Sequence, residues 1–292
     1  MKKYLLFTVG GLLLFTAIIF AQLPSRIQIS SLSSHSAEYH KEFKIRSNNG
    51  QFGLFFRDKT IATYQFDEII EDPENRIFLT RQGDRFGAIS IRVLRADHIE
   101  IDGFFDDRWQ LLENEDGTTT LLSTSIIPNE FDEISKRNGR FWVKQGSKYG
   151  ILSSGGSVII RPEFDEITMQ NGRFWVRNGD KHGIFSLGGS LLIRPEFDEI
   201  RMQNGRFWVR NGDKHGIFSS GGSLLIRPEF DEIRMQNGRF WVRNGSKYGV
   251  FSSGGSVIIR PEFDRIRMQN GRFIAYRNNV QYTFSSSGSL IR

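Results

Sequence analysis

Residues 202–234 read MQNGRFWVRNGDKHGIFSSGGSLLIRPEFDEIR, and close copies of this stretch recur along the chain at intervals of 33 residues. Three kinds of residue mark the period most clearly: a Gly, a Phe and a Trp. They stand at Gly150, Gly183, Gly216 and Gly249; at Phe131, Phe164, Phe197, Phe230 and Phe263; and at Trp142, Trp175, Trp208 and Trp241. A fixed period of this length indicates a repeat architecture, in which one unit buries its apolar face only by stacking on its neighbours.

Each copy contains three turn signals, separated by short runs of β-branched and aromatic residues. In the quoted copy the turn signals are Asn204-Gly205, Asn211-Gly212 and Gly221-Gly222. Asn-Gly favours a tight hairpin because both residues accept positive φ. The runs between the turns are RFWVR, KHGIF and SLLIR, and each is too short for a helix. We therefore expect each copy to be a hairpin with at least one further strand.

The segment 195–200, which reads PEFDEI, predicts a different local structure. Phe197 and Ile200 are three residues apart, a spacing that a strand places on opposite faces and a helical turn on one face. A leading Pro and acidic residues near the first N–H groups also favour a helical turn. We expect a single helical turn here and at 162–167, 228–233 and 261–266.

Strand alternation assigns the aromatic residues of each copy to two faces. Phe207 and Val209 share one face, which we interpret as core. Trp208 and its flanking Arg residues share the other, which either packs against the adjacent unit, with Arg stacked on the indole, or lines a surface groove. In the groove interpretation, the candidate ligand-binding residues are Trp142, Trp175, Trp208, Trp241, Arg173, Arg206 and Arg239.

The repeat pattern extends beyond its cleanest copies, which span 131–273. Gly53 and its neighbours match the Gly position of the repeat, and Trp109 lies 33 residues before Trp142. We therefore expect a β-repeat domain over 44–292, with about seven to eight units.

The predicted fold class is all-β, with tandem 33-residue β-hairpin repeats arranged as an open solenoid-like stack. The alternative is a closed β-propeller, since seven or so units match the blade number of one. The near-identical inner copies suggest recent duplication, which an open stack tolerates and a closed ring does not. The last copy carries Ile274 in place of Trp and Tyr282 in place of Gly, as expected for a terminal unit with one side in water.

The N-terminus indicates export. Lys2 and Lys3 precede an uncharged apolar run, 4–21, so residues 1–21 are expected to be a helical signal peptide or a signal anchor. Residues 22–43 read as a polar linker with one short strand near 26–30. The rest of the chain would then lie outside the cytoplasm, in the periplasm or cell envelope, and touch the membrane only through 4–21 if that segment is not cleaved.

Composition narrows the classes of function. The chain has no Cys, which excludes disulfides, thiolate metal sites and a cysteine nucleophile. Its net charge is +6, but residues 251–292 hold six Arg against two acidic residues, whereas the copy at 168–200 balances four basic against four acidic residues. A nucleic-acid-binding array would gain positive charge with each unit, so nucleic acid is not an expected partner.

No residue is predicted to be catalytic, and no metal or cofactor is expected. His182 and His215 stand where other copies have Tyr149 and Tyr248, which favours aromatic packing over metal binding. The Asp-Glu pairs recur in successive copies, whereas an active site is normally single. We expect these acids at the start of the helical turn, or paired with basic residues of the repeat, namely Arg161, Arg194, Arg227 and Arg260.

The stretch from Gly212 to Phe218, followed by a Gly turn and then Ile226 to Ile233, resembles the WG (KWG-type) repeat family. Here the Lys-Trp-Gly step reads Lys-His-Gly or Lys-Tyr-Gly, while the Pro-Glu-Phe-Asp half matches better. The resemblance implies a β-rich bacterial repeat scaffold and supplies no catalytic residue.

These observations predict an exported or membrane-anchored repeat protein that is not an enzyme. The first hypothesis is an interaction module that presents the Trp and Arg residues to an unknown protein, peptide or glycan. The alternative is a purely structural envelope scaffold or spacer. An enzyme is the remote alternative, because no unique polar cluster stands out.

Overall fold

The computed structural model describes residues 27–29, 42–74, 76–96, 99–101 and 109–291. Within them the chain is all-β, as the sequence predicts. None of the helices in this described part is long and apolar enough to span a membrane. The predicted export segment 1–21 and most of the 22–43 linker lie outside the described residues. The short strand expected near 26–30 is present as β1 (Ile27–Ile29), which pairs antiparallel with β8 (Ile99–Ile101).

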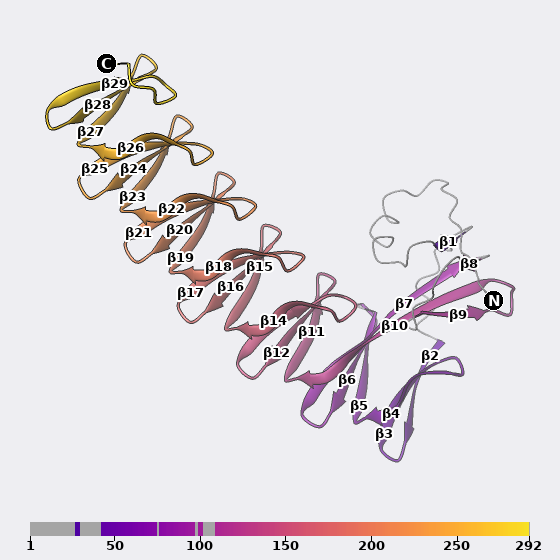
Figure 1. Ribbon diagram of the computed structural model, residues 1–292. Coiled ribbons are helices and arrows are strands. Elements are labelled where there is room, and N and C mark those ends of the chain that lie inside the picture. The colour runs from indigo at the N-terminus through magenta and orange to yellow at the C-terminus, as the bar shows by residue number, and fades with distance from the viewer. Residues whose placement is uncertain (1–26, 30–41, 75, 97–98, 102–108, 292) are drawn as a thin grey trace. The chain divides into compact units, whose positions relative to one another are not determined.

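The chain divides into a unit that ends at Pro162 and a unit that begins at Glu163. In the described part of the first unit, three larger antiparallel sheets follow one another along the chain, besides the β1–β8 pair (Figure 1). The first holds β2 (Phe43–Asn48), β3 (Gln51–Phe56) and β4 (Lys59–Phe66). The second holds, in spatial order, β5 (Glu68–Asp72), β6 (Ile77–Gln82), β7 (Arg85–Ala96), β10 (Thr119–Phe131) and β9 (Trp109–Glu113). The third holds β11 (Glu133–Arg137), β12 (Arg140–Gln145), β13 (Lys148–Leu152) and β14 (Val158–Phe164).

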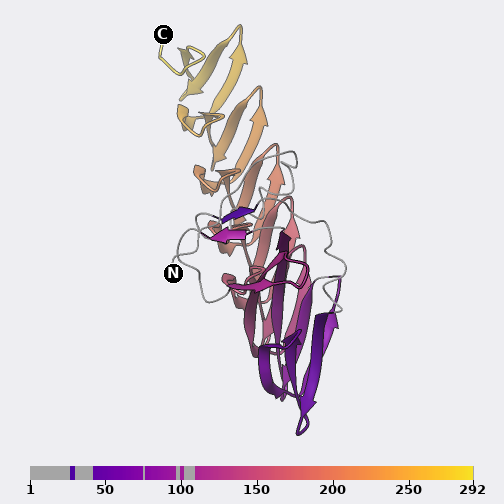
Figure 2. The ribbon, with the colours of Figure 1, turned by 90° about the vertical axis from the view of Figure 1, so that its right-hand side faces the viewer.

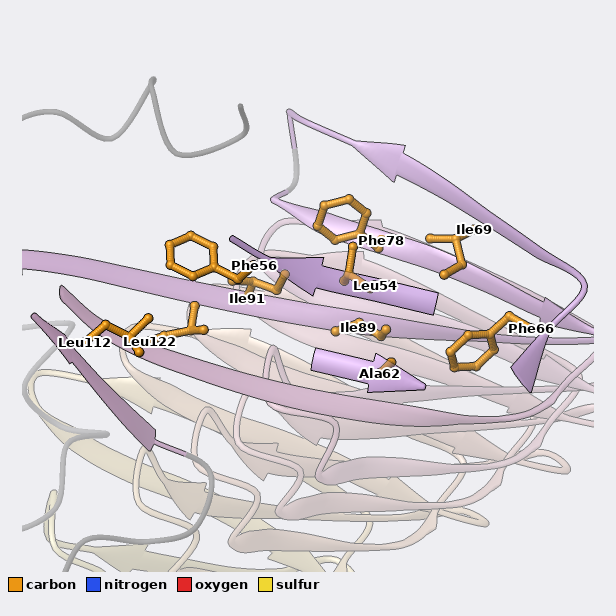
Figure 3. Close-up of a cluster of buried hydrophobic side chains, with 10 residues drawn as sticks. All are labelled: Leu54, Phe56, Ala62, Phe66, Ile69, Phe78, Ile89, Ile91, Leu112 and Leu122. Atoms are coloured by element: carbon orange, nitrogen blue, oxygen red, sulfur yellow. The ribbon is translucent and has the colours of Figure 1, made fainter. Parts of the chain in front are cut away.

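Apolar side chains of the first unit meet between its sheets. Leu54 and Phe56 of β3 pack with Phe78 of β6 and with Ile89 of β7, so the core joins the first sheet to the second (Figure 3). Leu54, Phe56 and Ile89 are fully buried. Each such side chain contributes about 1.5–3 kcal/mol through burial. The sheets of this unit are therefore held together by shared apolar layers.

In the second unit, residues 163–291 are all described and form four further sheets in chain order (Figures 1 and 2). Three of these sheets have four strands each and the last has three. The strands are β15 (Glu166–Gln170), β16 (Arg173–Asn178), β17 (Lys181–Ser186) and β18 (Leu191–Phe197); β19 (Glu199–Gln203), β20 (Arg206–Asn211), β21 (Lys214–Ser219) and β22 (Leu224–Phe230); β23 (Glu232–Gln236), β24 (Arg239–Asn244), β25 (Lys247–Ser252) and β26 (Val257–Phe263); and β27 (Arg265–Gln269), β28 (Arg272–Arg277) and β29 (Val280–Phe284).

The core of the second unit also lies between consecutive sheets. Ile184, Ile193 and Phe197 from the β15–β18 sheet pack with Phe207 and Val209 from the β19–β22 sheet. All five side chains are buried. The prediction that the Phe/Val face is core is confirmed, and one layer of this core draws on two copies of the repeat. The same arrangement recurs between the next pairs of sheets.

Two-residue turns connect the first three strands of each copy. The Asn-Gly prediction is confirmed at Asn204 and Gly205, which have φ of 51° and 69° and join β19 to β20. The second turn lies one residue later than predicted. Asn211 is the last residue of β20, and the turn is formed by Gly212, with φ of 57°, and Asp213. Gly212 takes this positive φ without the steric cost that a Cβ would add.

The helical turn predicted for 195–200 is wrong. Phe197 ends β18 and Ile200 lies in β19, so the two residues belong to different sheets. The chain bends between them at Asp198, whose N–H donates to the carbonyl of Arg210 at 2.9 Å. Pro195 lies in an irregular stretch of β18, a position where its missing N–H costs no ladder hydrogen bond. The three-residue spacing therefore reflects a change of sheet, not a helical period.

The Gly that defines the repeat permits a close approach between two strands. A Cβ on Gly216 would lie 2.8 Å from the nitrogen of Pro228 and 2.9 Å from the carbonyl oxygen of Ile226. A Cβ on Gly53 would likewise lie 2.9 Å from the carbonyl oxygen of Ala62. Both neighbours are backbone atoms, which cannot move aside as a flexible side chain can. This approach explains why Gly recurs at this position of the repeat.

Trp109 does not occupy the Trp position of the repeat, contrary to the sequence prediction. It begins β9, which pairs with β10 at the edge of the five-stranded sheet. In that sheet Leu79 of β6 faces Ala88 of β7, as Trp208 faces Ile217 in the cleaner copy. The long β7–β10 pairing separates this copy from the next and disrupts the simple 33-residue spacing.

Candidate functional site

The candidate Trp residues lie on the second strand of their sheets and are half-buried. Within the second unit, each indole packs edge-on against a Phe of the following sheet. Trp175 meets Phe207 at 6.0 Å between ring centroids and 72°, and Trp208 meets Phe240 at 6.0 Å and 74°. Such T-shaped pairs contribute about 0.5–1.5 kcal/mol beyond the area they bury. The indoles therefore lie within the contact between adjacent units.

The other two Trp residues have related environments. Trp241 packs on Phe273 at 5.9 Å and 64°, and Trp142 is half-buried on β12, opposite Ile151 of β13. Trp175 Nε1 donates a long hydrogen bond of 3.4 Å to the carbonyl of Gln170. The ring nitrogens of Trp208 and Trp241 are buried without a hydrogen-bond partner. The indole N–H groups of these two residues consequently face protein and not solvent.

The candidate Arg residues contact the following sheet through the same interface. Arg173 lies over the ring of Phe207 at 5.3 Å and donates from Nη2 to the carbonyl of Ser220 at 2.8 Å. Arg206 repeats both contacts on Phe240 and Ser253, and Arg239 makes the equivalent contacts one copy further on. One interpretation of the sequence expected the guanidinium to stack on the indole. It stacks instead on a Phe of the following sheet. We call Trp175, Trp208, Trp241, Arg173, Arg206 and Arg239 the intersheet ladder.

A second set of intersheet contacts involves the Lys and the Asp of the repeat. Lys181 Nζ, on the third strand of one sheet, donates to Asp198 Oδ1 at 2.6 Å, where the next sheet begins. The other carboxylate oxygen of Asp198 accepts the N–H of Gly212 at 2.6 Å, in the turn between β20 and β21. One carboxylate thus ties a neighbouring sheet to a hairpin turn of its own sheet. The contacts recur as Lys214–Asp231–Gly245 and Lys247–Asp264–Asn278.

These contacts lower the pKa of the carboxylates. The hydrogen bond from Lys181 and then that from Gly212 lower the pKa of Asp198, and the pKa of Asp231 is lowered in the same way. The pKa of Glu199 is lowered by a hydrogen bond from Arg201 and further by Arg210. The acids are held in their charged form by partners, which is the opposite of what a general acid requires.

The Lys–Asp contact was missed from the sequence, which instead paired the acids with residues such as Arg194. The partner of Asp198 is Lys181, 17 residues earlier, in a strand that belongs to the preceding sheet. Arg194 forms no ion pair among the described residues. The signal that identifies the true partner is the constant 17-residue interval between Lys and Asp in successive copies. This interval can be interpreted only when it is known that the Lys ends up in one sheet and the Asp in the next.

The ladder and the Lys–Asp contacts bring basic, aromatic and carboxylate groups together between sheets. Within the described ranges, no group of three or more His, Asp or Glu side chains could hold a metal ion. The arrangement instead repeats the same aromatic, cationic and carboxylate contacts from sheet to sheet.

A family model recognises part of this repeated pattern. The model for the WG containing repeat matches at 149–181, 183–214 and 216–248. Residues 149–248 are three tandem WG repeats. Each WG repeat begins on the third strand of one sheet and ends on the third strand of the next, so the sequence repeat and the sheet are offset. The Trp–Phe, Arg–Phe and Lys–Asp contacts join residues of consecutive WG repeats.

Beyond the WG repeats, similarity to other known proteins is limited. No curated protein matches the chain. Hsv2p of Kluyveromyces lactis is 11% identical, with 75% of this chain and 74% of that chain covered and a TM-score of 0.22. AztD of Citrobacter koseri is 11% identical, with 86% and 80% covered and a TM-score of 0.25. Likeness at TM-scores this low does not indicate a shared fold or function.

Proposed function

We propose that this chain is an exported, non-catalytic scaffold in which WG repeats serve as structural modules. The observation that carries the proposal is the use of the intersheet ladder. The Trp and Arg residues that look most suited to a ligand make contacts between sheets instead. Their repetition supports a role in fixing the position of each sheet on the next. The scaffold would set the length and surface of an envelope component without performing chemistry.

The open solenoid-like stack is part of this proposal. In the second unit each sheet packs on the next one in chain order, and the last sheet differs from the others at Ile274 and Tyr282. Both features support an array that ends, as opposed to a ring that closes on its first blade. An open array lets copy number change without loss of packing.

A second candidate function is binding of a peptide, protein or glycan through the Trp and Arg residues, Trp142 included. The half-buried state of the indoles favours it, because part of each ring stays accessible. The triple variant W175F/W208F/W241F separates the two candidates. Phe keeps an aromatic ring against Phe207, Phe240 and Phe273 but removes the indole face.

The test is a glycan array together with a pull-down of the full-length chain and the triple variant. The scaffold proposal expects the same binding profile from both proteins, including the absence of any ligand. A ligand bound by the wild type and lost in the variant, with the unfolding midpoint unchanged, would favour the binding function and contradict the scaffold.

Export is tested separately, because the scaffold role does not depend on it. Residues 1–43 are fused to a phosphatase that is active only outside the cytoplasm. We expect activity, and we expect replacement of Leu12, Leu13 and Leu14 by Asp to abolish it, since charge in the apolar run opposes insertion. An active fusion that survives this replacement, or an inactive native fusion, would show that residues 1–21 do not direct export.

A further inference from the structure

The fourth strand of each four-stranded sheet in the second unit lies at an edge, with a strand partner on one side only. It presents three exposed side chains in the same pattern in successive copies: an aliphatic residue, an Arg and a Glu. We call the two complete sets the edge ridge: Leu191, Arg194 and Glu196 of β18, and Leu224, Arg227 and Glu229 of β22. Val257 and Arg260 of β26 continue it.

The charged groups of the edge ridge lack the contacts that most repeated charges of this unit make. The ladder Arg residues, Lys181, Lys214 and Lys247, and Asp198, Asp231 and Asp264 all have partners. Arg194 and Arg227 make no ion pair, hydrogen bond or ring contact with any residue in 163–291, and the same holds for Glu196 and Glu229. Each copy thus exposes one free cation and one free anion two residues apart, on either side of a Pro.

The aliphatic members of the edge ridge are also unusually exposed. Leu191 is 46% exposed, Leu224 47% and Val257 53%. Each immediately follows a Gly-Gly-Ser turn and precedes the charged residues of its strand. A row of accessible aliphatic residues next to unpaired charges is typical of a surface that contacts another molecule.

We propose that the edge ridge is a self-association surface whose occupant is the edge ridge of a second copy of this chain. The order of charges carries this assignment. When two copies meet antiparallel across a two-fold axis centred near Pro195, Arg194 of each copy faces Glu196 of the other. A row of one sign would repel its own copy, whereas this alternating row attracts it. The aliphatic residues add apolar area to the same contact.

The backbone of the edge strand restricts how the two copies meet. β18 has register irregularities against β17, and Pro195 supplies no N–H. Both features oppose addition of another strand in a continuous ladder. The association therefore occurs through side chains, which gives a closed pair held weakly and not an open-ended sheet. Exposed ion pairs are individually weak and are screened by salt.

The test measures the mass of the full-length chain by sedimentation equilibrium over a range of concentrations and salt. We expect a monomer–dimer equilibrium at about 50 mM salt, and a dissociation constant that rises at least about tenfold at about 500 mM, where screening acts within a few ångströms. A chain that stays monomeric at every concentration in low salt, or that forms larger open-ended assemblies, would overturn the proposal.

Charge reversal identifies the surface. R194E/R227E makes the edge ridge uniformly acidic and E196R/E229R makes it uniformly basic. We expect each variant alone to be monomeric and their equimolar mixture to form a heterodimer. Variants that dimerise alone as the wild type does, or a mixture that stays monomeric, would contradict the assignment.

The matched control is D180R/D213R. It changes the net charge by the same amount as E196R/E229R but at exposed hairpin turns. We expect the control to dimerise like the wild type, and loss of its dimer would show that net charge, and not the edge ridge, governs association. The unfolding midpoint of each variant confirms that these exposed substitutions leave the fold intact.

Discussion

At the scale of single residues, the repeated Gly of the third strand has the most definite role. A methyl group at Gly216 would lie 2.8 Å from the nitrogen of Pro228, so Gly216→Ala forces the backbone of two strands apart. We expect the substitution to lower the free energy of unfolding by about 1–3 kcal/mol, the usual cost of overpacking. Urea denaturation followed by circular dichroism measures the effect.

The control is Gly221→Ala in the same copy. A Cβ on Gly221 would have its nearest neighbour, the Ser219 hydroxyl, 3.9 Å away, and the φ of Gly221 is not positive. Alanine there is expected to be neutral or slightly stabilising, since it reduces the entropy of the unfolded chain. Equal losses at Gly216 and Gly221 would mean that the close approach to Pro228 does not exist.

The Lys–Asp contacts predict how stability depends on pH. The pKa of Asp198, Asp231 and Asp264 is lowered in the folded chain by the Lys and backbone N–H partners. A carboxyl whose folded pKa is lowered contributes stability above its unfolded pKa of about 3.9 and loses that contribution as the pH falls through the folded pKa. We expect the unfolding midpoint to be flat near neutral pH and to fall below about pH 4.

The triple variant D198N/D231N/D264N tests the cause of this acid limb. Asn still accepts the backbone N–H but carries no charge to titrate. The variant is expected to be less stable than the wild type at pH 7 and to show a shallower loss below about pH 4. An acid limb of unchanged depth would assign the pH dependence to other groups.

Individual residue roles were only partly predictable from the sequence. Alternation along a strand correctly placed Phe207 and Val209 in the core, because that rule is local. The ring under Arg173 was not predictable, since Phe207 belongs to the next sheet and lies 34 residues away. The same reason concealed the pairing of Lys181 with Asp198. Contacts that cross between sheets require the stacking arrangement to be known first.

At the scale of elements, the T-shaped aromatic pairs are expected to couple one sheet energetically to the next. In a double-mutant cycle, Trp208→Ala and Phe240→Ala should show a coupling energy of about 0.5–1.5 kcal/mol. Trp208 and Phe273 belong to sheets that are separated in chain order by the β23–β26 sheet, so that pair serves as the control and should be additive within about 0.5 kcal/mol. Additivity at Trp208 and Phe240 would remove the aromatic pair as a link between sheets.

Strands and hairpin turns were predicted well, because short β-branched runs and Asn-Gly are strong local signals. Asn204 and Gly205 adopt positive φ as expected. The PEFDEI segment was misread as a helical turn because its three-residue spacing has two explanations. Phe197 and Ile200 reach the same intersheet core, but from two successive strands with the bend at Asp198 between them. A change of sheet in mid-segment leaves no periodic signal of its own.

At the scale of the whole molecule, the open-stack proposal predicts that length follows copy number. Deleting residues 199–231 removes one unit and joins Asp198 to Glu232, which preserves the Asp-Glu sequence at the junction. Because stacked sheets are about 10 Å apart, the maximum dimension from small-angle scattering should shorten by about 10 Å. A closed ring would lose its closure instead, with a large loss of stability and no stepwise change in length.

The repeat period was sufficient to predict that sheets depend on their neighbours, since no single copy has enough apolar surface for a core. It was not sufficient to place Trp109, because the β7–β10 pairing departs from the period. A regular array is thus predictable as far as its copies remain regular. Departures from the period must be read from the strand pairing itself.

The central claim is that the core lies between sheets, so that one sheet has no core of its own. The most direct test is the peptide 199–230, which contains β19 to β22, studied beside the full-length chain. We expect the peptide to show no cooperative unfolding by circular dichroism in urea or on heating, while the full chain unfolds cooperatively. A peptide that folds as a monomer with a sharp unfolding transition would contradict this account.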